Sequence, residues 1–378
     1  MNIKNNISKP EYDRSILSIS SSIMKHYGVK SNYSSLNELD IILKNNYKNV
    51  IFLILDCLGT KILENNLSEK SILKTNLVTN VTSVFPPTTA AATSAIHSGL
   101  SPLENGWIGW MPYFKEHNRM IELFTGKDFY TKEKIFDVSK SDITYKTIYE
   151  KICDVNKNIN FHKVFSVKVD ADGATTFEEL CDRIKDNCNN ESRNLISAYW
   201  IEPDHTIHYN GINSNNVKKV LGNIDENLQK LIDSLENSVI VITADHGAVD
   251  VKEIYINEIK EIDDCLALPP SIESRFVSFF IKKGMKNKFK NALKKYFKDK
   301  YILYTKQQFL NEGLLGKGEQ HKRINDYLGD YILIINSELN IRYSLDGKRD
   351  NSHLADHGGI TADEMLVPLI VLETGKNK

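Results

Sequence analysis

Three acids and three histidines stand at or soon after the ends of apolar segments in this sequence: Asp56, Asp204, His208, Asp245, His246 and His357. Carboxylate and imidazole together form a ligand set suited to zinc, and also to manganese or iron. Each residue alone is equally typical of a helix cap or of an ordinary core or surface histidine. Buried together, however, three carboxylates repel one another unless a cation neutralises them. The combination therefore predicts a metal centre.

These side chains divide into two sets that could each hold one divalent ion. One set consists of Asp204, His208 and His357. The other consists of Asp56, Asp245 and His246, with Thr89 as a further oxygen ligand. Two metal ions ~4 Å apart promote in-line displacement at phosphorus. The residue types therefore predict two divalent ions, and the ligands allow zinc, manganese or iron.

Thr89 lies in the segment Val84–Gly99, which is typical of a strand, a tight turn at Pro86 and Pro87, and an alanine-rich helix. A threonine at a helix N-terminus is most often only a cap. The same place also offers free backbone N–H groups and the positive end of the helix dipole, which suit an anion. A hydroxyl activated by a dication there would be a nucleophile. Because the predicted ligands surround it, we favour the nucleophile.

The elements that must position these residues read as buried strands. The segments Lys48–Asp56, Asn194–Ile201 and Ser238–Thr243 are continuous apolar runs, as expected for parallel strands covered on both faces. After Gly211, apolar residues recur at helical spacing as far as Leu235. Alternating strands and helices predict an α/β fold, a doubly wound, mostly parallel sheet with helices on both faces. Ligands of such sheets bind beyond the carboxyl ends of the strands, where the acids and histidines should converge.

The pattern changes between residues 250 and 350. Short strands are predicted at Phe276–Ile281, Tyr301–Tyr304, Tyr331–Ile335 and Ile341–Tyr343, and a very basic helix at Lys286–Lys298. We therefore predict a metallohydrolase core of residues 1–250 and 351–378, with residues 251–350 inserted as a small α+β subdomain.

The composition narrows the class of protein. The chain of 378 residues has 41% hydrophobic residues and a formal net charge of −1. It therefore has enough apolar residues for a large core, and its charge gives no support to a nucleic-acid polymer as partner. Five scattered cysteines without a CxxC motif, no apolar leader and no membrane-length apolar run indicate a cytoplasmic protein away from the membrane. The oligomeric state stays open.

Five motifs occur in order along most of the chain: LILD with Asp56, FPPTT…SG with Thr89, EPDHTIH with Asp204 and His208, TADHG with Asp245 and His246, and DHGG with His357. In combination they resemble the alkaline phosphatase superfamily and, within it, the type I phosphodiesterase/nucleotide pyrophosphatase family. The resemblance implies a bimetallic site, usually of zinc, and a threonine that is transiently phosphorylated or nucleotidylated. It also selects Thr89 over Thr88, because the family's nucleophile falls ten residues before the glycine that is Gly99 here.

The sequence departs from the family at two positions. Where the family often has an asparagine that binds a phosphoryl oxygen, this chain has Trp110, and a second frequent asparagine is replaced by Ala92. Candidates for the missing contacts to the phosphoryl oxygens are Thr88, backbone amides, Arg275 and His353. Trp110 is a further candidate for contact with the substrate. Arg275 could equally be an ordinary salt-bridge residue, and Trp107 and Trp110 could stack on a substrate ring or belong to the core.

The predicted function is hydrolysis of a phosphodiester or pyrophosphate bond in a nucleotide-like or other small organic phosphate, through a covalent threonine intermediate. A phosphomonoesterase or a phosphonate hydrolase on the same core is the alternative. A protein that kept the fold without catalysis is disfavoured, because Thr89 and all the predicted ligands are present.

Overall fold

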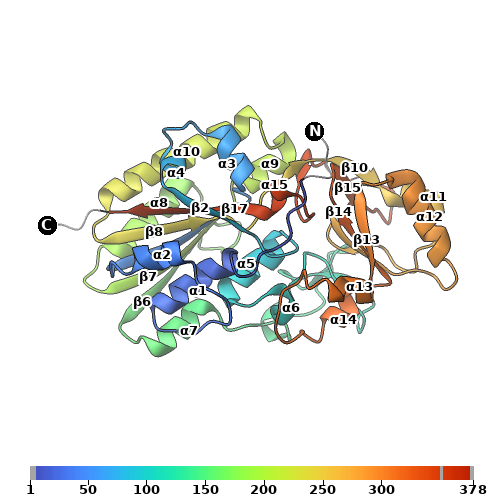
Figure 1. Ribbon diagram of the computed structural model, residues 1–378, viewed down its shortest axis with the longest axis horizontal. Helices are drawn as coiled ribbons and strands as arrows, with labels where there is room; N and C mark the ends of the chain where they lie inside the picture. The colour runs from blue at the N-terminus through green and yellow to red at the C-terminus, as the bar shows by residue number, and fades with distance from the viewer. Residues whose placement is uncertain (1–5, 350–351, 375–378) are drawn as a thin grey trace.

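Four neighbouring strands of the central sheet run parallel to one another in the computed structural model, which describes residues 6–349 and 352–374. The whole sheet has the order β2-β17-β8-β1-β7-β6 (Figure 1). Its strands are β1 (Asn49–Leu55), β2 (Leu77–Thr82), β6 (Ile159–Phe165), β7 (Arg193–Trp200), β8 (Ser238–Thr243) and β17 (Leu366–Glu373). Only β17 runs antiparallel to its neighbours, β8 and β2. The prediction of a mostly parallel α/β sheet is confirmed.

Helices cover both faces of this sheet, as a doubly wound fold requires (Figure 1). One layer contains α1 (Ile16–His26), α2 (Asn37–Leu43), α5 (Thr89–Ser98) and α7 (Ile148–Val155). The other contains α3 (Thr60–Asn66), α4 (Ile72–Thr75), α8 (Phe177–Cys188), α9 (Asp204–Asn210) and α10 (Asn215–Ser234). The predicted amphipathic helix is α10, and it buries Val217, Leu221, Ile224, Leu228 and Leu231.

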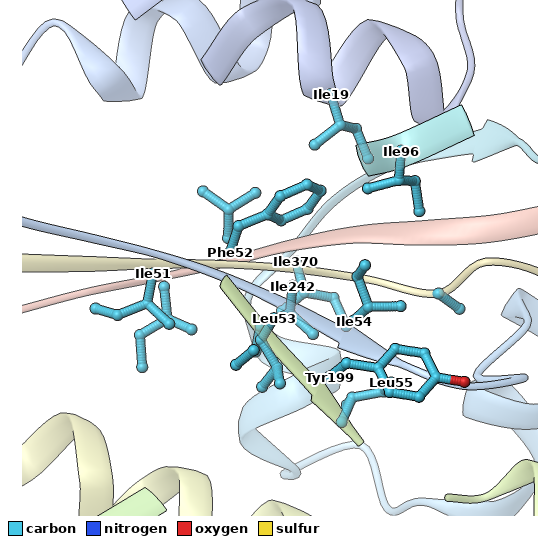
Figure 2. Close-up of a cluster of buried hydrophobic side chains, with 14 of the residues drawn as sticks. Ile19, Ile51, Phe52, Leu53, Ile54, Leu55, Ile96, Tyr199, Ile242 and Ile370 are labelled. Atoms are coloured by element: carbon cyan, nitrogen blue, oxygen red, sulfur yellow. The ribbon is translucent and has the colours of Figure 1, made fainter. Parts of the chain in front are cut away.

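The main core lies between the sheet and these two layers. Every residue of β1 is buried, which explains why its sequence is a continuous apolar run. In Figure 2, Phe52 points toward Ile19 of α1 and Ile96 of α5, whereas Ile51 and Leu53 point to the opposite face. This alternation lets one strand pack against both helical layers. The sheet is therefore a rigid base for the residues that follow its strands.

A second, smaller sheet lies beside the carboxyl ends of the central strands, drawn in orange and red in Figure 1. It is antiparallel, in the order β11-β12-β14-β13, and consists of β11 (Ser271–Ile272), β12 (Phe276–Phe279), β13 (Tyr301–Thr305) and β14 (Tyr331–Ile335). The predicted basic helix is α12 (Lys286–Phe297), which buries Phe289, Ala292, Leu293 and Phe297 against it. The last predicted strand of this region is β15 (Leu339–Arg342), which pairs in parallel with β10 (Lys252–Tyr255).

The second core also includes residues that precede position 250. Phe85 packs edge to face on Phe276 of β12, with ring centroids 5.0 Å apart. Trp107 is buried in the same cluster and donates its indole N–H to the Ile143 carbonyl at 2.8 Å. Trp107 is thus a core residue. The division of the chain at residues 251–350 stays a prediction.

The remaining elements are short. They are α6 (Pro102–Asn105), β3 (Tyr113–Phe114), β4 (Arg119–Glu122), β5 (Lys127–Asp128), β9 (Val249–Asp250), α11 (Lys260–Asp263), α13 (Lys306–Asn311), α14 (Ile324–Tyr327), β16 (Ala355–Asp356) and α15 (Ala362–Met365). Two 3₁₀ turns occupy Val138–Lys140 and Ile256–Glu258. Among the described residues, no helix combines the length and apolar character needed to span a bilayer.

Candidate metal centre and active site

The carboxyl ends of three adjacent strands carry the predicted acids. Asp56 directly follows β1, and Asp245 and His246 follow β8. Asp204 begins the helix α9 after β7, which places His208 one turn later on the same face. His357 comes from the loop after the short strand β16. The order β8-β1-β7 in the sheet therefore brings these segments to one edge.

The first predicted ligand set is assembled. One nitrogen or oxygen atom each from Asp204, His208 and His357 lies within 4.8 Å of the others. Nε2 of His208 is 3.2 Å from Oδ2 of Asp204, and Nε2 of His357 is 3.8 Å from Oδ1 of the same carboxylate. Two imidazoles and a carboxylate thus converge on one point.

The second predicted set is also assembled. Ligand atoms of Asp56, Asp245 and His246 lie within 4.8 Å of one another. Nε2 of His246 is 3.5 Å from Oδ1 of Asp56 and 3.6 Å from Oδ2 of Asp245. The rings of His246 and His357 stack with centroids 3.8 Å apart, so the two sets are neighbours.

A close approach of two loops holds the second set together. A Cβ atom on Gly59, after β1, would lie 2.5 Å from Cα of Gly247, after β8. Oδ1 of Asp245 accepts the backbone N–H of Cys57 at 3.1 Å and that of His246 at 3.0 Å. The hydroxyl of Tyr199 donates to Oδ2 of Asp56. One oxygen of each carboxylate is therefore fixed by the protein.

The other oxygens are unpartnered. Oδ1 of Asp56, Oδ1 of Asp204 and Oδ2 of Asp245 are buried and have no hydrogen-bond partner among the described residues. A buried carboxylate oxygen without a partner is costly. Each of these oxygens lies between 3.5 and 3.8 Å from a histidine nitrogen of the two sets. The donor atoms therefore fit bound divalent cations.

The pKa values of the carboxyl groups show the charge imbalance that a metal would relieve. Burial, together with the Asp245 charge, raises the pKa of Asp56 well above its usual value, and burial raises the pKa of Asp245 to about 6. Burial also acts on Asp204, but His208 outweighs it and holds the pKa of Asp204 below its usual range. Without a metal ion, Asp56 and Asp245 of the second set therefore keep their protons to a higher pH than ordinary carboxyl groups do, as expected for a site that binds a positive charge.

Two of the three histidines, His246 and His357, are in the neutral form that binds metals. Burial lowers the pKa of His246 and of His357 to about 4, so both rings are neutral at neutral pH. Nδ1 of His246 lies 3.1 Å from the Gly247 carbonyl, and Nδ1 of His208 lies 2.9 Å from the Ala355 carbonyl. Donation of Nδ1–H to these carbonyls directs both Nε2 atoms toward the ligand sets. For His208, burial lowers the pKa, but the Asp204 carboxylate 3.2 Å from Nε2 outweighs it and raises the pKa to about 10 in the metal-free protein, so this ring must lose a proton before it can bind a metal.

Thr89 is the first residue of α5, and the preceding Thr88 is its N-cap. The Thr88 hydroxyl accepts the backbone N–H of Ala91, which makes Thr88 the capping threonine of the pair. Oγ1 of Thr89 lies 3.1 Å from Nε2 of His246. The structure therefore brings the predicted nucleophile to the second ligand set.

Some of the residues that the sequence predicts to contact the substrate line a cleft, and others do not. A cleft of about 360 Å³ is lined by Thr89, Trp110 and His353, together with Asp204, His208 and His357. Nδ1 of His353 is 3.2 Å from Oδ2 of Asp356, and its ring lies 4.3 Å from that of His208. Trp110 is 37% exposed. Both residues are thus accessible to a substrate, whereas Thr88 is 1% exposed.

Arg275 lies outside the cleft, which corrects the expectation that it contacts phosphate. It is fully buried, and its Nε is 2.7 Å from Oε1 of Glu364 on α15. Its terminal nitrogens donate to Glu364 and to the carbonyls of Ser337 and Leu339. The guanidinium is therefore committed to a buried ion pair and has no donor directed at the site.

One cleft residue has no signal in the sequence. Glu273, in the turn between β11 and β12, accepts the backbone N–H of Trp110 on Oε1 at 2.6 Å. Burial and the nearby Asp356 raise the pKa of Glu273 to about 8. Its carboxyl thus lies beside the residue that replaces the family's asparagine, a position that depends on the packing of the second sheet against α5.

Comparisons with known proteins place this geometry in context. Residues 50–359 match the family model of type I phosphodiesterase/nucleotide pyrophosphatase. No curated protein sequence gives a match.

Solved structures share the fold. Murine ectonucleotide pyrophosphatase/phosphodiesterase 5 has a TM-score of 0.64 at 19% identity, over 85% of this chain and 87% of that one. Phosphonoacetate hydrolase from Sinorhizobium meliloti, solved with phosphonoacetate, has a TM-score of 0.61 at 14% identity, over 86% and 91% of the two chains. Because the family model covers most of the sequence, the chain belongs to the type I phosphodiesterase/nucleotide pyrophosphatase family, a family of hydrolases that act on phosphoester bonds.

Proposed function

We propose that this protein is a two-metal phosphohydrolase that cleaves phosphodiester or pyrophosphate bonds of a small organic phosphate through a covalent threonine intermediate. The observation that carries the proposal is the position of Thr89. Its hydroxyl lies 3.1 Å from Nε2 of His246, which belongs to the second ligand set, and the first ligand set is adjacent. A murine family member solved as an inactive variant with AMP supports a nucleotide-like substrate.

The metal ligands in this proposal are Asp204, His208 and His357 for one ion and Asp56, Thr89, Asp245 and His246 for the other. Divalent ions held there, with zinc expected, would neutralise the carboxylates and lower the pKa of the threonine hydroxyl. A cytoplasmic location remains part of the proposal.

The residues of the chain divide the chemistry between them. Oγ1 of Thr89 attacks phosphorus, the bond from phosphorus to the leaving oxygen breaks, and the phosphoryl group becomes attached to Thr89. Free N–H groups at the start of α5 donate to the phosphoryl oxygens. Water then cleaves the bond between phosphorus and Thr89, which restores the hydroxyl and releases the phosphorylated product. The cleft holds the second ester group of a diester.

Hydrolysis of bis(4-nitrophenyl) phosphate tests the proposal. The metal-loaded protein is expected to contain about two transition-metal ions per chain and to prefer this diester to 4-nitrophenyl phosphate. Thr89→Ala should lower kcat by at least about 10³-fold, because the nucleophile is removed. Thr89→Ser, which keeps a hydroxyl, is the matched control and should retain measurable turnover.

Three results would contradict the proposal. Full activity of Thr89→Ala would refute the nucleophile, and a metal-free active protein would refute the metal centre. A preference for the monoester would instead favour a phosphomonoesterase. The fold shared with phosphonoacetate hydrolase makes phosphonoacetate the substrate with which to test the phosphonate alternative.

A further inference from the structure

The cleft that Thr89 lines also has many aromatic and aliphatic wall residues. They include Met111, Phe129, Tyr130, Tyr255, Ile341 and Tyr343. Among the described residues that line this cleft, Arg342 is the one lysine or arginine. It is the last residue of β15, so its backbone is fixed by the pairing with Tyr255 of β10.

Arg342 is only partly neutralised by the protein. Its Nε lies 3.3 Å from Oε1 of Glu253, and no other ion pair is formed with a described residue. That carboxylate is shared, because Oε1 also accepts the backbone N–H of His353 at 3.1 Å and Oε2 accepts the Ser352 hydroxyl at 3.0 Å. A guanidinium carries five N–H donors in a planar fork. Its terminal nitrogens are therefore available in the cleft, where its side chain is 21% exposed.

The same contacts fix the guanidinium relative to the metal centre. Glu253 joins Arg342 to the backbone of His353. The His353 ring lies 4.3 Å from that of His208, a predicted ligand. Three contacts in series thus connect Arg342 to a predicted metal ligand, which suits recognition of a second group on the substrate.

We propose that Arg342 binds an anionic group, a carboxylate or a phosphate, carried by the part of the substrate that lies beside β15 in the cleft. This inference rests on the proposed function and names its substrate class, an organic phosphoester with a second anion remote from the scissile bond. A planar oxyanion matches the fork of the guanidinium in a bidentate pair. The apolar walls strengthen this pair, because they lower the local dielectric.

Matched phosphodiesters test the proposal. All release 4-nitrophenolate, and the second aryl group is plain phenyl, 3-carboxyphenyl or 3-phosphonooxyphenyl. The metal-loaded protein is expected to show a KM at least about 10-fold lower for one or both anionic esters than for the phenyl ester. The ester with the larger gain distinguishes carboxylate from phosphate.

Substitutions then assign the preference to Arg342. In Arg342→Gln the ratio of KM values between the phenyl and the anionic ester should fall to about one, whereas Arg342→Lys should retain part of it. Arg183→Gln, at an exposed arginine of α8 paired with Glu179, is the control and should leave the ratio unchanged. An unchanged ratio in Arg342→Gln, or no preference in the unsubstituted protein, would overturn the proposal.

Binding without turnover separates this inference from the proposed function. Calorimetry with metal-loaded Thr89→Ala compares 3-carboxyphenyl phosphate and 3-phosphonooxyphenyl phosphate with phenyl phosphate. Tighter binding of either anionic compound that is lost with the additional Arg342→Gln substitution supports the inference, even if no ester is hydrolysed. Equal binding of all three compounds overturns it, whatever the outcome of the diester assay.

Discussion

Glu273 places a buried carboxyl group next to the N-terminus of α5, where an anionic substrate is expected. A Cβ atom added to Gly109 would lie 2.9 Å from Cγ of Glu273, and one added to Gly358 would lie 3.8 Å from its Cβ. The loops that contain Gly109 and Gly358 therefore pack closely against the turn that contains Glu273. Burial is therefore the main reason why the pKa of Glu273 is raised to about 8. Such a carboxyl makes stability depend on pH.

The direction of this dependence follows from proton binding. Glutamate in the unfolded chain loses its proton near pH ~4.3. The metal-free folded protein keeps the proton up to about pH 8, so the free energy of unfolding falls as the pH rises between these values. The substitution Glu273→Gln removes this loss. The Tm of the variant minus the Tm of the unsubstituted protein should therefore be about 3 °C higher at pH 8 than at pH 5. Scanning calorimetry of chelator-treated proteins measures it, and a Tm difference independent of pH would contradict it.

At the scale of elements, Arg275 fastens the second sheet to the segment that precedes β17. It stands directly before β12 and pairs with Glu364 of α15, and both side chains are fully buried. Removal of one partner from a buried ion pair leaves the other charge without compensation.

Arg275→Met should therefore lower the free energy of unfolding by about 3–5 kcal/mol. The double variant Arg275→Met with Glu364→Gln should recover part of this loss, because no unpaired charge remains. Urea unfolding of the two variants checks both statements. If Arg275→Met kept full stability and lost only affinity for substrate, Arg275 would contact the substrate, contrary to what its buried position indicates.

The sequence predicts the central strands well and the second sheet less completely. Strands buried on both faces, such as Asn49–Leu55, show a continuous apolar run. The two-residue strands β3 and β5 have no periodicity to detect, and the order of strands depends on packing between distant segments. Likewise, an arginine beside an apolar strand gives no sign of whether it binds a substrate or, as Arg275 does, a buried glutamate.

The site likewise contains some residues that could be predicted from the sequence and others that could not. Five of the six predicted ligand residues could be named from the sequence because they follow β1, β7 and β8, strands that end at the same edge of the sheet, whereas His357 comes from the loop after β16. The structure brings both sets together, with Thr89 beside one of them. Glu273 and Arg342 could not be named, because their positions come from the folding of the second sheet and of β15 onto this edge.

At the scale of the molecule, the predicted metal centre brings together regions far apart in the chain, from Asp56 to His357. Metal removal should therefore lower the Tm of the whole protein. Without metal, the raised pKa of Asp245, about 6, makes the folded state less stable as the pH rises from about 4 through 6, because the buried carboxyl must then ionise. Bound cations cancel this loss.

We therefore expect a chelator to lower the Tm by at least about 5 °C at pH 7.5 and by less at pH 5. Scanning calorimetry with and without chelator at both pH values measures the difference, and restored zinc should reverse it. Asp245→Asn, which removes the ionisable group, should reduce the dependence of the metal-free protein on pH. A chelator effect equal at both pH values would contradict this account.

The position of β17 governs when the fold can be completed on the ribosome. β2 is an edge strand whose one neighbour in the central sheet is β17, and β17 also covers the edge of β8. Residues 77–82 are made early, whereas residues 366–373 are made after every other strand. Until β17 has been synthesised, the edges of β2 and β8 that it covers have unpaired backbone N–H and C=O groups, which could form hydrogen bonds with another chain. Completion of the sheet therefore requires the synthesis of β17, and until then the open edges of β2 and β8 favour aggregation.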